Sequence, residues 1–141
     1  MILIVDANVV ISALIRNSKS RELLTISPFV LYSPDTLLES IEKYKEEFIQ
    51  RSELSDKDFE TLLSFILEKI TIVNQQEYKS KLEQAQDIIG HIDIGDVDYI
   101  ALALSVKNDG IWSDDAHFQK QDKIKVYQTE DIVRLIEKDF K

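Results

Sequence analysis

The stretch Ile2-Leu3-Ile4-Val5-Asp6 decides the fold that we expect for this chain. Four consecutive large aliphatic residues are typical of a short strand buried on both faces, and an acid follows the strand at once. The stretch Ile111-Trp112-Ser113-Asp114-Asp115 repeats this arrangement late in the chain. Because α/β folds place their sites at the carboxyl ends of parallel strands, the two stretches predict acids at one edge of a parallel sheet.

Strand-like and helix-like segments alternate along the rest of the chain. Further strands are predicted at 29–32, 70–73 and 123–127, and helical spacing of apolar residues predicts helices near 8–14, 33–48, 55–67, 78–90, 99–106 and 132–136. Ser33 is expected as an N-cap, with Pro34 at the first helical position. Strands separated by helices need crossover connections, so we expect an α/β protein, a three-layer α/β/α sandwich with a mostly parallel central sheet of about five strands.

The composition fits a single domain over residues 1–141. A chain of 141 residues buries about two thirds of its unfolded surface, which is enough for a core without disulfides. The chain has no cysteine, which suits a reducing compartment. Its first apolar run is too short for a signal peptide, and no apolar run is long enough to cross a membrane. We therefore expect a cytoplasmic protein with no membrane attachment.

The net charge of −9 argues against a broad basic face for nucleic acid, because such binding depends on many Lys and Arg side chains near phosphates. Two small basic clusters remain as candidates for local contacts with a polynucleotide. They are Arg16, Lys19 and Arg21 after the first helix, and Lys120, Lys123 and Lys125 after the second acidic strand end. Either both clusters flank the acidic edge, or they are solvated loop charges.

Asp6, Asn8 and Glu39 each have a structural and a functional explanation. Asp6 is placed to cap the first helix, and it is also placed at the expected sheet edge. Asn8 lies on that helix, from which it can hydrogen-bond around Asp6 or form part of the polar flank. Glu39 lies at the margin of the apolar face of its helix, so it is either an inward acid or an ordinary surface glutamate.

The acids later in the chain leave two alternatives open. Asp96 and Asp98 stand at the start of an apolar helix, where acids favour the positive end of the helix dipole, and two residues apart they cannot face the same way. Asp114 and Asp115 suit either a turn or a site. His91 and His117 have no metal-binding partner at helical spacing, and we expect both in surface or loop positions.

Carboxylates gathered at one sheet edge require a compensating charge. Several of them within a few ångströms repel one another strongly, so they persist only if a cation neutralises them or if some stay protonated. Hard oxygen ligands without cysteine or histidine select Mg²⁺ or Mn²⁺. The acids therefore predict a divalent metal site suited to phosphodiester hydrolysis.

The order of these residues resembles the PIN-domain family over nearly the whole chain. The stretches that carry the resemblance are Val5-Asp6-Ala7-Asn8-Val9, Leu37-Leu38-Glu39, Asp96 with Ala101 and Ala103, and Ile111-Trp112-Ser113-Asp114-Asp115-Ala116-His117-Phe118. Each stretch is short, but together they stand in the family's order on the expected elements. The resemblance implies a PIN fold and cleavage of RNA with Mg²⁺ or Mn²⁺.

The resemblance also implies roles for particular residues and partners. The catalytic metal ligands implied are Asp6, Glu39, Asp96 and Asp115. Asn8 and Ser113 would hold the ligand geometry, while Asp98 and Asp114 remain competitors of Asp96 and Asp115. The length is similar to that of the VapC-type toxins of toxin–antitoxin pairs, which implies a paired antitoxin protein and a homodimer, although stand-alone PIN ribonucleases share it.

Two other functions are compatible with such a sheet. A phosphotransfer domain would use Asp6 as its acceptor, but the haloacid-dehalogenase-like form expects an Asp where Asn8 stands, and the receiver form expects an acid where Asn74 stands. A PIN-fold module that binds RNA or protein without cleaving it is the third reading. Because all four candidate acids are kept, the sequence favours the ribonuclease.

Overall fold

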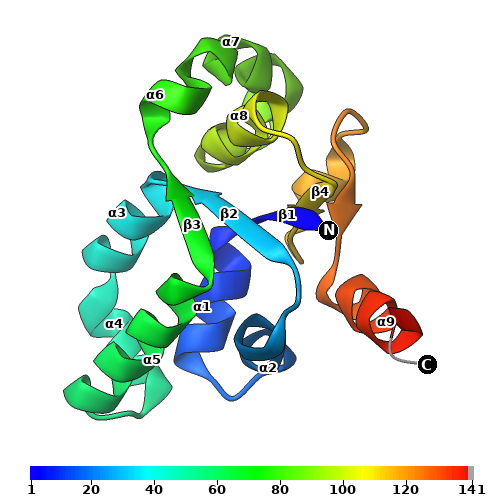
Figure 1. Cartoon of the computed structure of the whole chain (residues 1–141). Coiled ribbons are helices and arrows are strands. Elements are labelled where there is room, and N and C mark those ends of the chain that lie inside the picture. Colours follow the sequence, from blue (N-terminus) through cyan, green and yellow to red (C-terminus); the bar gives the residue numbers. More distant parts are fainter. Residues whose placement is uncertain (140–141) are drawn as a thin grey trace.

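The computed structural model describes residues 1–139 and contains one sheet of five parallel strands (Figure 1). The strands lie in the order β3-β2-β1-β4-β5. Their bounds are Ile2–Val5 for β1, Val30–Pro34 for β2, Ile70–Val73 for β3, Gly110–Trp112 for β4 and Val126–Tyr127 for β5. The predicted α/β class is confirmed, and the sheet is parallel throughout. Because β1 and β4 are neighbours at its centre, the two acid-bearing strand ends lie side by side.

Helices cover both faces of the sheet, which gives three layers (Figure 1). One face packs against α1 (Ala7–Ile15), α2 (Lys19–Ile26), α3 (Thr36–Lys43), α4 (Lys45–Ser52), α5 (Asp56–Glu68) and α9 (Thr129–Asp139). The other packs against α6 (Gln75–Tyr78), α7 (Leu82–Ala85) and α8 (Val97–Ser105), with the short turns η1 (Lys79–Lys81), η2 (Gln86–Gly90), η3 (Ile94–Asp96) and η4 (Phe118–Lys120). Alternation along β1 sends Leu3 and Val5 into the first core and Ile4 into the second.

The expected start of the second helix is wrong. Ser33 and Pro34 end β2, and α3 begins at Thr36 with Asp35 in the N-cap position. The buried Ser33 hydroxyl donates a 2.6 Å hydrogen bond to the carbonyl oxygen of Val5, so it ties two strands together instead of capping a helix. The predicted long helix is also interrupted at Tyr44, where α3 ends and α4 follows.

The sequence did not predict the helix α2, and this helix gives the first basic cluster (Arg16, Lys19 and Arg21) a structural explanation. Its N-cap Ser18 accepts a hydrogen bond from the amide of Arg21, and the Arg21 side chain donates to the carbonyl of Ala13 at 2.7 Å. Arg21 thus satisfies the carboxyl end of α1. Asp6 and Arg16 occupy opposite caps of α1, about 15 Å apart along its axis. The prediction that this cluster flanks the acidic edge is therefore wrong.

Candidate functional site

Asp6 leaves β1 at the edge of the sheet and is almost completely buried. Its amide donates to the carbonyl of Trp112 at 3.0 Å, which continues the pairing of β1 with β4. Although Asp6 occupies the N-cap position of α1, its side chain makes no capping hydrogen bond. Instead Oδ2 accepts a hydrogen bond from the Ser113 hydroxyl at 2.7 Å. Helix capping therefore does not account for this carboxylate.

Ser113 joins Asp6 to Asp115, and the linkage continues to α1. The fully buried Ser113 hydroxyl accepts a hydrogen bond from the amide of Asp115 at 3.0 Å while it donates to Asp6. Asp115 Oδ2 accepts from the side-chain amide of Asn8 at 2.9 Å, and Oδ1 accepts from the amide of His117 at 2.9 Å. Four of the predicted residues, on two segments more than 100 residues apart in the sequence, thus form one hydrogen-bonded chain.

Asp96 enters the same region from the other side of the sheet. It ends η3 and occupies the N-cap position of α8, makes no capping hydrogen bond, and is only 8% exposed. Its buried Oδ2 has no hydrogen-bond partner. A buried carboxylate oxygen without a donor is costly unless another group, such as a cation, compensates it.

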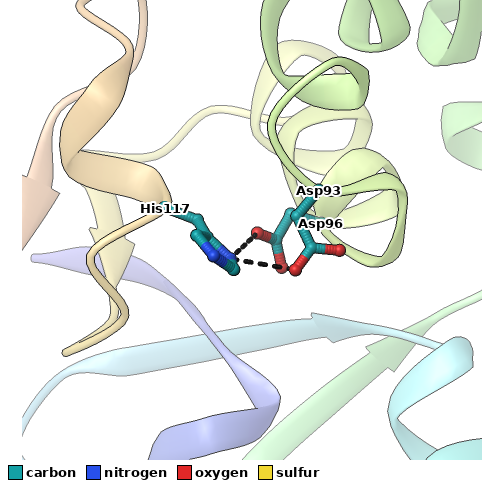
Figure 2. A group of neighbouring side chains, drawn as sticks. All are labelled: Asp93, Asp96 and His117. Atoms are coloured by element: carbon teal, nitrogen blue, oxygen red, sulfur yellow. Dashed lines mark ion pairs between the residues drawn. The ribbon is translucent and has the colours of Figure 1, made fainter.

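A histidine faces this carboxylate (Figure 2). Nδ1 of His117 lies 3.7 Å from Oδ2 of Asp96, 2.9 Å from Oδ2 of Asp93 and 3.3 Å from Oδ1 of Asp115. Asp93 itself is held by its own turn, because its Oδ1 accepts the amide of Gly95 at 2.8 Å. Figure 2 shows the imidazole, from the segment before η4, pointing at the two carboxylates beside η3.

Burial and mutual repulsion make the two innermost acids hard to ionise. Burial raises the pKa of Asp6 to about 6; the Ser113 hydrogen bond partly opposes this, and the charge of Asp115 adds to it. Burial also raises the pKa of Asp96 to about 7, and the charges of Asp6, Asp93 and Asp115 contribute further. Without a cation, the site holds fewer negative charges than its acids would carry in water.

Glu39 and Asp98 lie in a separate acidic group. Burial raises the pKa of Asp98, followed by the charges of Asp35 and Glu39. Asp35 accepts a 2.6 Å hydrogen bond from the Tyr78 hydroxyl. Glu39 is exposed on α3, and within residues 1–139 no hydrogen bond or ion pair joins it to Asp6, Asp96 or Asp115. Asp96 and Asp98 therefore point to different groups of acids, as their spacing predicts.

Asp114 turns away from the site and binds α9. One of its carboxylate oxygens accepts the amide of Thr129 at 2.7 Å, and the other accepts the Thr129 hydroxyl. Thr129 is the first residue of α9. Of the two neighbouring acids, Asp115 is the one beside Asp6 and Asp96.

Sequence reasoning missed three side chains around Asp96. Asp93 was not among the candidate site residues, and the surface or loop position expected for His117 does not describe its contacts, since it faces three carboxylates. Tyr99 has a buried hydroxyl with no hydrogen-bond partner, and burial and the charges of Asp6, Asp96 and Asp98 raise its pKa. The available signals were the closeness of Asp93 to Asp96 in the sequence, the three-residue spacing of Asp96 and Tyr99 at the start of the helix, and the nearness of His117 to Asp115.

The donor set fits a divalent cation. Asp96 lies near enough to Asp6 and Asp115 for their charges to raise its pKa, and its Oδ2 lacks the positive partner that its burial requires. Carboxylates of this kind suit Mg²⁺ or Mn²⁺.

Among residues 1–139, no helix has both the length and the apolar character that crossing a membrane requires.

Comparison with known proteins agrees with this architecture. The family model described as the PIN domain matches residues 4–134, which include every acid discussed above. No curated protein matches the chain. PIN domains are generally metal-dependent nucleases. Since the match spans both acid-bearing strand ends and nearly the whole chain, the chain belongs to the PIN-domain family.

Proposed function

We propose that the chain is a ribonuclease that hydrolyses RNA phosphodiester bonds with Mg²⁺ or Mn²⁺. The observation that carries the proposal is the buried, unpartnered Oδ2 of Asp96, which lies beside Asp6 and Asp115 at the carboxyl edge of the sheet. Such a gathering of hard-to-ionise carboxylates is typical of a functional site. A divalent ion bound there lowers the pKa of a coordinated water and stabilises the leaving oxygen of a phosphodiester.

The residues of the chain have distinct tasks in this proposal. Asp6 and Asp96 hold the ion directly, and Asp115 completes its ligands directly or through water. Ser113 and Asn8 fix the orientation of Asp6 and Asp115 through the hydrogen bonds already described. Glu39 is exposed and, among the described residues, no hydrogen bond joins it to the inner acids, so in this proposal it would act through water or on the substrate side.

Cleavage of a short labelled RNA tests the proposal. The wild-type protein should cleave with Mn²⁺ and stop when EDTA is added, and both Asp6→Asn and Asp96→Asn should lose activity while remaining folded. Asp87→Asn, at an exposed residue of η2, is the matched control and should keep activity. If both site variants cleave normally, the proposed nuclease site is wrong. If the wild type neither binds Mn²⁺ nor cleaves, the chain is a non-catalytic PIN module.

We further propose that the ribonuclease is the toxin of a toxin–antitoxin pair, bound by an antitoxin and active as a homodimer. The support is the resemblance to the VapC-type proteins, because match to the PIN domain alone leaves the biological role open. Induced expression in a bacterial host should arrest growth for the wild type and not for Asp6→Asn. Unimpaired growth at matched protein levels would show that the chain is a PIN ribonuclease of another kind.

A further inference from the structure

We propose that His117 and Asp93 join Asp96 as direct ligands of the ion, so that the site contains an imidazole nitrogen and prefers Mn²⁺ to Mg²⁺. This inference rests on the proposed metal-dependent function and adds two ligands to it. Neither residue belongs to the set Asp6, Glu39, Asp96 and Asp115 that the family resemblance implies.

The first support is the separation of the three donor atoms. One donor atom each from Asp93, Asp96 and His117 lies within 4.8 Å of the other two. Ligands bonded to one ion at about 2.1 Å stand about 3 Å apart when adjacent and about 4.2 Å apart when opposite. Nδ1 of His117 lies 2.9 Å from Asp93 Oδ2, close to the lower value, and 3.7 Å from Asp96 Oδ2, between the two values.

The second support is that two of these atoms are buried without a hydrogen bond. Oδ2 of Asp96 and Nδ1 of His117 are both buried atoms without a hydrogen-bond partner, and the Asp96 side chain is only 11% exposed. The approach of Nδ1 to Asp93 is close, but its geometry does not make a hydrogen bond. A shared cation satisfies both atoms at once, because a neutral imidazole and a carboxylate each present a lone pair to it.

The chemistry of the donors decides which ion the site favours. Carboxylates alone suit Mg²⁺ and Mn²⁺, whereas an imidazole nitrogen suits transition-metal ions. Asp93 adds a further oxygen, and its other oxygen is already fixed by the amide of Gly95. Mg²⁺ exchanges its water ligands for protein groups only reluctantly. A histidine ligand at position 117 should therefore make the site favour Mn²⁺.

The alternative explanation is that a protonated His117 serves as an internal cation for the surrounding acids. Its contacts with Asp93, Asp96 and Asp115 also suit that arrangement. The two explanations predict different effects on Mn²⁺ affinity when His117 is removed. Removing a ligand weakens Mn²⁺ binding, whereas removing a competing positive charge leaves Mn²⁺ binding unchanged or strengthens it.

Pulsed electron paramagnetic resonance of bound Mn²⁺, with calorimetry, separates these outcomes. The wild type and the control His91→Gln, at an exposed histidine of the same chain, should show coupling of Mn²⁺ to a ¹⁴N nucleus. His117→Gln should lose that coupling and bind Mn²⁺ about 10-fold or more weakly, with a smaller loss for Mg²⁺. Asp93→Asn should weaken both ions and keep the coupling, and circular dichroism checks that each variant is folded.

Three results would overturn the inference: no ¹⁴N coupling in the wild type, coupling that persists in His117→Gln, or unchanged or tighter Mn²⁺ binding by His117→Gln. A wild type that binds Mn²⁺ and cleaves RNA but shows no nitrogen ligand overturns only this inference. A wild type that neither binds Mn²⁺ nor cleaves RNA overturns the proposed function with it.

Discussion

The hydroxyl of Ser113 donates a 2.7 Å hydrogen bond to Oδ2 of Asp6, and the two residues are 107 positions apart in the sequence. The bond joins the ends of two neighbouring parallel strands, since Val5 and Trp112 are partners in the register of β1 and β4. The same hydroxyl accepts the amide of Asp115. One buried side chain therefore fixes the positions of two candidate metal ligands.

Replacing Ser113 by alanine should loosen this arrangement. Asp6 would lose its hydrogen-bond donor, and the amide of Asp115 would lose its acceptor. Loss of a group that orients a metal ligand typically costs about 10- to 100-fold in metal affinity or activity. We therefore expect Ser113→Ala to bind Mn²⁺ about 10- to 100-fold more weakly by calorimetry. Ser113→Thr keeps the hydroxyl and is the control. Equal affinity in Ser113→Ala and the wild type would show that the bond has no part in metal binding.

The fold was predictable because the strongest patterns in the sequence coincide with the centre of the sheet. Ile2–Val5 and Ile111–Trp112 are apolar on both faces, and the structure buries Ile4 and Ile111 in one core and Leu3 and Trp112 in the other. The start of α3 was not predictable from the local pattern. Ser33 followed by Pro34 fits a helix start as well as a strand end, and only the pairing of β2 with β1 and β3 decides between them.

The inner acids were predictable from their positions at strand and helix ends, but their neighbours were not. The choice between Asp114 and Asp115 depends on the direction of the chain after β4, which places Asp114 against Thr129 and Asp115 against Asn8. The contacts of His117 depend on η3 and the segment before η4 approaching each other. No spacing along the sequence encodes that approach.

Asp114 and Asp115 offer a matched pair for separating stability from activity. Asp114 holds the first turn of α9 through Thr129, so Asp114→Ala should lower the free energy of unfolding by about 1 kcal/mol, as the loss of a helix cap does. Asp115→Ala should abolish cleavage with a smaller effect on unfolding. Urea denaturation and the RNA assay measure the two effects. The opposite pattern, with cleavage lost in Asp114→Ala alone, would exchange the two roles.

Glu39 should contribute less to metal binding than Asp96. It is exposed and, among the described residues, no hydrogen bond joins it to Asp6, Asp96 or Asp115, so we expect it to act on the ion through water. We expect Glu39→Gln to slow cleavage about 10-fold or more, as for groups that act on a metal indirectly, and to lower Mn²⁺ affinity less than Asp96→Asn does. Glu42→Gln, on the same helix and also exposed, is the control. If Glu39→Gln lowers Mn²⁺ affinity as much as Asp96→Asn, then Glu39 is a direct ligand.

The raised pKa of Asp6 predicts a cost in stability for the metal-free protein. The pKa is about 6 in the folded protein and near 3.8 for an unperturbed aspartate. Between these values the folded state binds more protons than the unfolded state, so the free energy of unfolding falls as the pH rises from about 4 to about 6 and then levels off. Asp96, whose pKa is about 7, extends the decline in the same direction to about pH 7.

Asp6→Asn removes this ionisation and keeps an oxygen for the Ser113 hydroxyl. In EDTA at pH 8 the variant should therefore be more stable than the wild type by about 1 to 3 kcal/mol, and at pH 4 the difference should disappear. Mn²⁺ should reverse the order at pH 8, because it stabilises only the protein that binds it. Urea denaturation of both proteins at pH 4 and pH 8, each with and without Mn²⁺, measures the free energy of unfolding under all four conditions. If Asp6→Asn is less stable than the metal-free wild type at pH 8, the carboxylate supports the fold. Its burial would then no longer be evidence for a metal-binding role.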